Sequence, residues 1–450
     1  MKTILQPIRT VSALCGPQKS FPHDARLTHH CVCVQCEDGR LLYHAMTGEL
    51  ILLEPGDTLE NRREELIRRR YLVPADFDEI RYADQVLKTV RLAVPAPKRI
   101  SGCMIFTTTD CNARCFYCYE LGRKRVNMSD ETAHDVAEYI AGLDREEELN
   151  ITWFGGEPLF NRRVIDIITR DLREKGVKFF SQMISNGYLF DEETVAAARN
   201  DWNLRFIQIA LDGTEEIYNK SKAYIYREGS AYQRVMRNIG LLLEAGVNVN
   251  IRLNTDARNA QDLRELSREL KERFGQYANL HVYVALIHDF GGVQHDFKSR
   301  EEKLRCYKQL REYLKETGLN KSASLRRTVA LTSCMADEDG RLSILPDGHI
   351  GRCEHESEQD FVGSIYSQEQ DTALIEAWKE KIKSPACGDC PLYPRCTILK
   401  KCAWYAQGCT DVDRAIMRIN MEEQILSTYK KEISREKNSA AAEFMPEELC

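Results

Sequence analysis

The middle of the chain alternates between two patterns of hydrophobic and polar positions. Short apolar runs with the length and composition of buried strands occur at 103–107, 150–154, 179–184, 204–211, 247–253 and 281–286. Between them, apolar residues recur with helical spacing over 131–143, 163–174, 191–199, 232–245 and 260–274. Ser129 and Asp191 stand where helix N-caps are expected. The pattern predicts an α/β fold of parallel strands with right-handed crossovers, as a barrel or an open sheet, with ligands at the carboxyl ends of the strands.

The two ends of the chain show different patterns. Residues 1–95 predict a small α+β domain, with strands around 31–36 and 40–44 and a helix near 60–70. Residues 95–97, Pro-Ala-Pro, mark a boundary, and the α/β core then covers 96–300. Residues 301–450 open with a charged helix, become rich in Cys, Gly and Pro, and return to helix near 411. This last composition is typical of a loop-rich region that is stabilised by metal.

Composition narrows the function classes. The 450 residues include 63 basic and 69 acidic side chains, and no apolar run approaches the 18 residues of a membrane-spanning helix. We therefore expect a cytoplasmic protein with neither nucleic acid nor a membrane as partner. The 17 cysteines are unusual, because so many thiols in a reducing compartment indicate soft metal ions. Their odd number also argues against a complete disulfide framework.

Three of the cysteines follow the first predicted strand on one loop. Cys111 and Cys115 are separated by three residues, and Cys115 and Cys118 by two. Cysteine thiolates are the usual ligands of iron–sulfur clusters, so the loop can hold three corners of a 4Fe–4S cube and leave one iron open. Zinc is the alternative, but zinc sites usually have a fourth protein ligand, and this loop offers no obvious one.

The loop Cys111-Asn-Ala-Arg-Cys115-Phe-Tyr-Cys118 resembles that of the radical S-adenosylmethionine (radical SAM) superfamily. The resemblance extends over roughly residues 100–290 and implies a partial (β/α)6 barrel. It also implies that the open iron binds S-adenosylmethionine, which one electron cleaves to a 5′-deoxyadenosyl radical. Tyr117 matches the aromatic residue that the family places against the adenine; the alternative is a packed loop aromatic.

Further segments at the predicted strand ends fit this resemblance. Gly155-Gly156-Glu157 resembles the family's GGE motif, whose backbone and carboxylate meet the methionine amino group, and we expect Gly156 to permit close approach of the cofactor. Ser185 and Asn186 end the third strand, where the family uses a hydroxyl near the ribose or carboxylate. Leu211-Asp212-Gly213 ends the fourth. Either of the last two segments could also be a plain turn.

Two more positions are candidates for contact with the cofactor. Arg252 and Asn254 lie on one face of the fifth strand, and a charged side chain within an apolar strand needs a partner, such as the cofactor's carboxylate or ribose. Lys222 stands where related sulfatase maturases have an arginine for the carboxylate. A lysine lacks the bidentate fork of arginine.

A second group of cysteines lies near the C-terminus. Its spacing resembles the SPASM extension of radical SAM enzymes, which carries two auxiliary clusters and is typical of enzymes that modify peptides and proteins. The match departs in one place, because five residues separate Cys396 and Cys402 where the family has three. A pair of zinc knuckles that includes Cys387-Gly-Asp-Cys390 is the alternative.

The resemblance implies a total of three 4Fe–4S clusters. One auxiliary cluster would take Cys334, Cys353 and Cys402, and the other would take Cys387, Cys390, Cys396 and Cys409. The first set is one ligand short. Cys306, His349 or His355 completes it, or the last iron is open to substrate.

The N-terminal region suggests the substrate. Residues 28–95 loosely resemble the peptide-recognition element of maturases of ribosomally made peptides, which would add a leader-peptide strand to a sheet edge. We therefore expect an oxidoreductase that takes a hydrogen atom from a precursor peptide and installs a thioether or carbon–carbon cross-link, with a flavodoxin- or ferredoxin-like protein as external electron donor. The alternatives are an anaerobic sulfatase-maturating enzyme that generates formylglycine, and a non-catalytic iron–sulfur protein.

Overall fold

The computed structural model describes most of the chain. The described residues are 1–9, 11, 15–21, 24–93, 99–287, 297–320, 323–325, 334–355, 358–393, 396, 398–405 and 408–443. The predicted boundary at 95–97 lies outside them. Within the described residues, no helix combines the length and apolar character that crossing a bilayer requires.

A parallel sheet forms the centre of the molecule. Its strands are β7 (Ile100–Thr108), β8 (Arg145–Gly155), β9 (Lys178–Ser185), β10 (Leu204–Leu211), β11 (Asn248–Thr255) and β12 (Leu280–Leu286). Each strand pairs in parallel with the next one along the chain. The prediction of a parallel α/β core with a partial (β/α)6 arrangement is confirmed.

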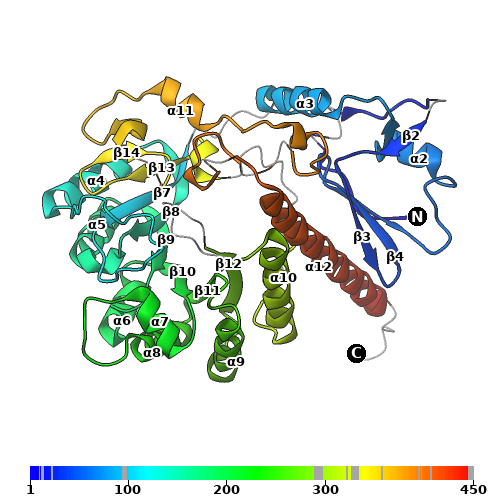
Figure 1. The fold of residues 1–450 in the computed structure, drawn as a ribbon. Coiled ribbons are helices and arrows are strands. Elements are labelled where there is room, and N and C mark those ends of the chain that lie inside the picture. Colours follow the sequence, from blue (N-terminus) through cyan, green and yellow to red (C-terminus); the bar gives the residue numbers. More distant parts are fainter. Residues whose placement is uncertain are drawn as a thin grey trace, which may run out of the picture.

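Helices between these strands cover the outer face of the sheet (Figure 1). They are α4 (Asp130–Gly142), α5 (Arg162–Glu174), α6 (Glu192–Asn200), α7 (Glu215–Lys222), α8 (Ala231–Glu244) and α9 (Asp262–Phe274). The predicted caps are confirmed, since Ser129 accepts the Thr132 N–H and Asp191 accepts the Thr194 N–H. The apolar faces of helices and strands form one large core. The sequence pattern missed α7, a short and mostly polar helix.

Both edges of this sheet contact the C-terminal region. Strand β13 (Arg341–Ile344) pairs in parallel with β7, and β14 (His349–Gly351) and β15 (Gly363–Ser364) extend the sheet further. At the other edge, α10 (Arg300–Glu316) packs against β12. The cysteine-rich region is therefore built onto the core sheet.

The N-terminal residues form a second, antiparallel sheet. Its order is β1 (Lys2–Leu5), β5 (Glu49–Leu53), β4 (Gly39–His44) and β3 (Cys31–Cys36), so the predicted strands at 31–36 and 40–44 are confirmed. Around it lie α2 (Arg63–Arg68), α3 (Glu79–Ala93) and the small pair β2 (Ala25–Leu27) and β6 (Leu72–Pro74).

The last helix of the chain joins the two sheets. Helix α12 (Asp411–Glu443) runs along the N-terminal sheet, where Ile425 and Tyr429 pack against Val32 and Val34 of β3 (Figure 1). The same helix packs against α10. Before it, the short α11 (Thr372–Trp378) inserts Trp378 into the main core. Segments from opposite ends of the sequence therefore share one hydrophobic cluster.

Candidate functional site

A cavity of about 240 Å³ lies at the carboxyl ends of the central strands. The three cysteines of the loop, Cys111, Cys115 and Cys118, line it. Eight of the nine residues predicted to contact a cofactor also line it, namely Tyr117, Gly155, Gly156, Ser185, Asn186, Lys222, Arg252 and Asn254. The structure therefore brings these residues from five separate segments of the sequence to one cavity.

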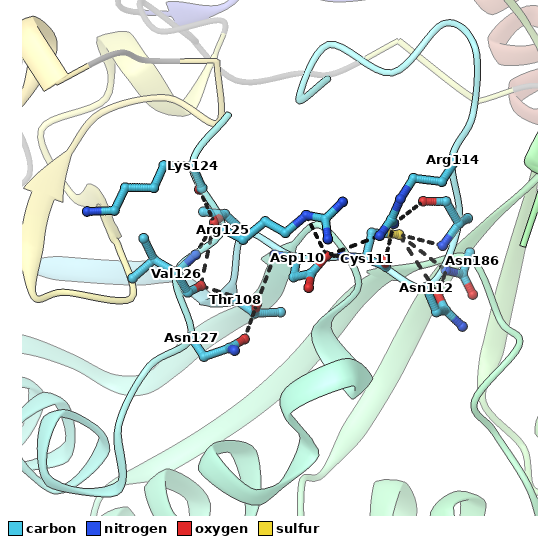
Figure 2. A network of polar contacts seen from close by, with 12 residues as sticks. Thr108, Asp110, Cys111, Asn112, Arg114, Lys124, Arg125, Val126, Asn127 and Asn186 are labelled. Carbon is cyan, nitrogen blue, oxygen red and sulfur yellow. Dashed lines mark hydrogen bonds and ion pairs between the residues drawn. The ribbon is translucent and has the colours of Figure 1, made fainter. Parts of the chain in front are cut away.

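Asp110 fixes the start of the cysteine loop. Its carboxylate accepts the Cys111 N–H at 2.8 Å and faces the guanidinium groups of Arg125 at 3.3 Å and Arg114 at 3.7 Å (Figure 2). Its own N–H donates to the Thr108 hydroxyl at 2.9 Å. These contacts tie the first cysteine to the end of β7, so a ligand held by the loop has a fixed position relative to the sheet.

The two glycines after β8 allow that strand end to touch the cysteine loop. Gly155 has a φ of +128°, and a Cβ there would lie 2.1 Å from the Thr108 carbonyl oxygen. A Cβ on Gly156 would lie 2.3 Å from the Asp110 carbonyl oxygen. Glycine is required here because another segment of the protein's own backbone comes close. The sequence analysis had predicted that the cofactor makes this close approach.

Glu157 is the predicted cofactor residue that does not line the cavity. Its buried carboxylate accepts the Ser185 hydroxyl and the Asn186 N–H, both at 2.8 Å. Burial raises the pKa of this carboxyl to about 7. The side chain thus ties the end of β8 to the end of β9 and positions Ser185 and Asn186 in the cavity wall.

A buried polar network forms one side of the cavity. The Tyr117 hydroxyl donates to Asp212 at 2.7 Å and accepts from Lys222 at 2.7 Å and from Asn254 at 2.9 Å. Lys222 also lies 3.3 Å from Asp212. Burial opposes the charge of Lys222, but the neighbouring Asp212 carboxylate holds the pKa of Lys222 well above its ordinary value. Asp212 was visible in the sequence only as a residue of a strand-end turn.

Residues of the C-terminal region form another part of the cavity wall. Glu354, His355 and Trp404 line the cavity there. The Trp404 indole N–H donates to His355, whose ring lies 4.1 Å from that of Tyr119. Sequence reasoning named His355 only as a candidate cluster ligand and did not find Glu354 or Trp404, because these residues follow Cys353 and Cys402 in loops without a motif of their own.

Arg252 lies near Trp404 and has one guanidinium N–H group without an acceptor in the described part of the chain. Its guanidinium lies 5.7 Å from the centre of the Trp404 ring, and its buried Nε has no hydrogen-bond partner among the described residues. Gln208, on the neighbouring strand, also lines the cavity and accepts the Tyr283 hydroxyl at 2.5 Å. Gln208 is a polar residue within the otherwise apolar strand β10, and this pattern in the sequence could have predicted it as a site residue. A buried donor without an acceptor fits a ligand that carries a carboxylate or hydroxyl group.

The loop thiols are suited to metal. Burial raises the pKa of Cys111 to about 12 and that of Cys115 to about 11, so both are neutral unless a cation deprotonates them. Within the described residues, no three His, Cys, Asp or Glu side chains converge closely enough to hold a single metal ion. Three soft donors around a cavity with free volume fit a multi-iron cube with a small ligand beside it.

Four of the C-terminal cysteines gather around a much smaller cavity. Cys387, Cys390, Cys396 and Cys409 line a space of about 20 Å³, together with Tyr393 and Met417. Asp84 of α3 accepts hydrogen bonds from Lys383 and from Tyr393, both at 2.6 Å. The N-terminal domain therefore contacts this cysteine site directly.

The other three cysteines of the predicted auxiliary sites lie near the main core. Cys353 is buried in it, and Cys334 and Cys402 pack against it. Of the proposed additional ligands, Cys306 lies on α10 near Arg264, and His349 is exposed on β14 and stacks on Phe361. His355 follows Cys353 by two residues and contacts Trp404, which follows Cys402 by two. Of the three, His355 is the one that the structure places beside this cysteine set.

Comparison with known proteins agrees with this geometry. The model of the radical SAM superfamily matches residues 105–270. The chain is 23% identical over 213 residues to a probable GTP 3',8-cyclase of Methanocaldococcus jannaschii, covering 46% of this chain and 67% of that protein. It is 24% identical over 160 residues to a cysteine-type anaerobic sulfatase-maturating enzyme of Clostridium novyi, covering 32% and 40%. An uncharacterized protein of M. jannaschii matches over 37% of its length, so these alignments span only part of the relatives.

Solved structures show the same fold. The protein anSMEcpe with bound AdoMet superposes with a TM-score of 0.55 at 15% identity, covering 75% of this chain and 100% of that one. Streptococcus suis SuiB bound to the precursor peptide SuiA superposes with a TM-score of 0.51 at 14% identity, covering 86% and 95%. The cysteine loop, the parallel strands and the family match lead to one conclusion: residues 105–270 are a radical SAM domain, a fold that implies a 4Fe–4S cluster and S-adenosylmethionine.

Proposed function

We propose that the chain is a radical SAM peptide maturase, which takes a hydrogen atom from a precursor peptide and installs a thioether or carbon–carbon cross-link. The observation that carries the proposal is the shared cavity, which residues of the cysteine loop and of the C-terminal cysteine region line together. A substrate residue in this cavity would meet the radical site and the second cysteine region together.

The residues of the cavity divide into two roles. Cys111, Cys115 and Cys118 would hold the cluster. Arg252, Asn254, Ser185 and Asn186 would meet the polar groups of S-adenosylmethionine, and Tyr117, with its hydroxyl fixed by Lys222 and Asp212, would present its ring to the adenine. When bound, the cluster and S-adenosylmethionine supply a one-electron cleavage that yields a 5′-deoxyadenosyl radical.

The C-terminal cysteines would hold two auxiliary clusters. Cys387, Cys390, Cys396 and Cys409 offer four thiols to one. Cys334, Cys353 and Cys402 offer three to the other, beside the cavity wall. Together with the cluster of the 111–118 loop, the protein would hold three clusters. We place the protein in the cytoplasm, where an external donor would supply its electrons.

The N-terminal domain supports a peptide with a leader as substrate. Strand β3 is one of the two edge strands of the N-terminal sheet, and an edge strand is where an extended peptide can be added to a sheet. The match to SuiB, which was solved with its precursor peptide, covers 86% of this chain, and the match to anSMEcpe covers 75%. Both matches are under 25% identical, so they support the fold and favour neither of the two activities.

The experiment is anaerobic reconstitution with iron and sulfide, followed by incubation with S-adenosylmethionine and a short peptide encoded beside the gene. We expect 5′-deoxyadenosine and a peptide that has lost two hydrogen atoms, with the new bond located by tandem mass spectrometry. Absence of 5′-deoxyadenosine in a protein with intact clusters would indicate the non-catalytic alternative.

A sulfatase-maturating activity is the second candidate, because of the identity to the Clostridium novyi enzyme. A sulfatase-derived peptide with a Cys or Ser at the target position tests it. Formylglycine on that peptide, without modification of the neighbouring-gene peptide, would decide for this alternative.

A further inference from the structure

Two thiols lie side by side on β3, an edge strand of the N-terminal sheet. Cys31 and Cys33 are separated by one residue, so their side chains project from the same face of the strand. Their sulfur atoms are 3.9 Å apart, and both are free, partly buried thiols. The third cysteine of the strand, Cys36, packs in the hydrophobic cluster on the other face. One face of β3 therefore carries two thiols, and not the three or four of the cluster sites.

The surroundings of the pair favour reaction at Cys33. A hydrogen bond from the Cys31 thiol lowers the pKa of Cys33 to about 7, although burial acts in the opposite direction. The positive charges of Arg40 and Arg418 add to the lowering of this pKa. The same hydrogen bond, together with burial, raises the pKa of Cys31. Because the thiolate is the attacking form in disulfide exchange, Cys33 is the thiol of the pair that reacts first.

A disulfide within one strand competes with the geometry of that strand. Two residues on the same face of a strand have Cα atoms about 6.7 Å apart. This separation is at the upper end of the range that disulfides span, about 4.4 to 6.8 Å. Closing the bond therefore shortens β3 at Val32, which pairs with Tyr43 of β4. Strained disulfides are easily reduced again, which is typical of reversible rather than structural bonds.

We propose that Cys31 and Cys33 are a reversible oxidation site that takes a low-molecular-weight disulfide as oxidant and that distorts β3 when oxidised. The Cys33 sulfur attacks one sulfur of the oxidant and displaces the first thiol. Cys31 then attacks the Cys33 sulfur and displaces the second thiol. One bond forms between Cys31 and Cys33, and the sulfur–sulfur bond of the oxidant breaks. Two electrons and two protons pass from the pair to the two released thiols.

The consequence for substrate binding rests on the proposed function, in which an edge strand of this sheet receives the leader peptide. An added strand pairs with a regular edge, so the disulfide and the leader peptide favour different shapes of β3. Coupling between two sites is reciprocal, so the disulfide weakens leader binding and bound leader disfavours the disulfide. Oxidising surroundings would therefore release the precursor peptide from the enzyme.

The first test maps the disulfide in the reconstituted holoprotein, which is incubated anaerobically with mixtures of oxidised and reduced glutathione. After free thiols are blocked with N-ethylmaleimide, the tryptic peptide 27–40 contains all three cysteines of β3. On oxidation we expect this peptide to lose two hydrogen atoms and to carry its only label on Cys36. Cys31→Ala should instead retain glutathione on Cys33, because no second thiol displaces it. Cys36→Ala is the matched control and should form the disulfide as the original protein does.

Two further measurements test the change in β3. Hydrogen exchange in the segment 31–44 should become at least ~10-fold faster on oxidation, because the pairing with β4 is disturbed. This measurement is independent of any substrate. Fluorescence anisotropy with the leader part of the peptide encoded beside the gene should give a dissociation constant at least ~10-fold higher for the oxidised protein, within the usual range of coupling between sites. In the double variant Cys31→Ala/Cys33→Ala, oxidised glutathione should leave both measurements unchanged.

Three results overturn the proposal. They are full labelling of Cys31 and Cys33 at every glutathione ratio, a disulfide that leaves exchange of the segment 31–44 unchanged, and equal affinity of the leader for the oxidised and reduced protein. A reduced protein that binds no leader would contradict the proposed peptide recognition instead. The mass and exchange measurements then decide on the oxidation site alone.

Discussion

The two best-defined cysteine sites of the protein differ in the room beside their thiols. Three thiols of the loop 111–118 share a cavity of about 240 Å³ with charged and aromatic side chains. Four thiols of the C-terminal region enclose about 20 Å³. A site with three soft donors and free volume can accept a second ligand, and a site with four donors and no volume cannot. The comparison therefore supports the proposal that the loop is a site for chemistry and the C-terminal site one for structure or electron transfer.

The two sites also differ in what holds them in place. The first is held to the ends of β7 and β8 by backbone hydrogen bonds and to the end of β9 by the Asn186 side chain, above one large core. The second lies in a small hydrophobic cluster where the loop around Cys390 meets Ile80 of α3 and Met421 of α12. Its position therefore depends on assembly of segments that are distant in sequence.

Removing the first site should have the largest effect. The triple variant Cys111→Ala/Cys115→Ala/Cys118→Ala should abolish formation of 5′-deoxyadenosine and lower the iron content by about four atoms per chain. The C-terminal sites should keep their iron, because their ligands lie in other segments. Iron analysis and chromatography of the reaction mixture measure both, and retained cleavage would contradict the assignment.

The sequence was sufficient to predict those features of the fold and of the first cysteine site that depend on local patterns. The six parallel strands followed from short apolar runs between amphipathic helices, and the cysteine loop followed from its spacing after the first strand. Ser185 was predicted from the family resemblance of a strand-end segment, and Arg252, with Asn254 on the same strand face, because a charged side chain within an apolar strand needs a partner. These signals are local, so one sequence suffices to see them.

The sequence could not show contacts between distant segments. Parallel pairing of β13 with β7 and the wall made by His355 and Trp404 depend on packing, which leaves no spacing to recognise. Glu157 was expected to face the cofactor, but a carboxylate at a strand end can turn to the next strand, as this one does. Asp212 was missed because its role depends on Lys222, ten residues later.

Cys390→Ala tests whether the second site is structural. We expect loss of that cluster and a fall in the free energy of unfolding of about 4 kcal/mol or more, since loss of a metal site is among the largest effects of a single substitution. Hydrogen exchange of α3 should rise, because α3 packs on this loop. Cys402→Ala is the contrasting variant, with a smaller fall, because Cys402 packs against the main core. Equal damage to stability, iron and peptide product in both would refute the distinction.

Lys222→Met tests the polar wall of the first site. It leaves Asp212 buried without its cation, which we expect to lower the free energy of unfolding by about 3 kcal/mol. The double variant Lys222→Met/Asp212→Asn should recover part of this loss, because the unpaired charge is gone. Urea denaturation of the apoprotein measures all three. If the double variant is no more stable than the single one, the pair does not act as described.

Gly156→Val tests how the cysteine loop is held. The new side chain would collide with the Asp110 carbonyl and push the loop away, so we expect loss of iron from the first site and a stability cost of about 2 kcal/mol. Had the glycine served only the cofactor, iron would be retained and cofactor affinity alone would fall. Gly142→Val is the control, since a side chain there meets nothing within 4 Å. Electron paramagnetic resonance and iron analysis distinguish the outcomes.

Asp84→Asn should have the smallest effect and tests the contact between the N-terminal domain and the second site. The pair of Asp84 and Lys383 is partly exposed, so we expect a loss of about 1 kcal/mol. Burial acts to raise the pKa of Asp84, but hydrogen bonds from Lys383 and Tyr393 outweigh it and hold that pKa below its ordinary value of 3.8. A lowered carboxyl pKa stabilises the fold above the pKa of the unfolded chain, and this contribution is lost as the pH falls through the folded pKa. The difference between the original protein and Asp84→Asn should therefore be full at pH 7 and disappear on acidification below about pH 4. Denaturation curves across this pH range measure the difference in stability, with Lys383→Met as the partner variant. A difference in stability that is independent of pH would show that the carboxylate charge does not join the domain to the cysteine site.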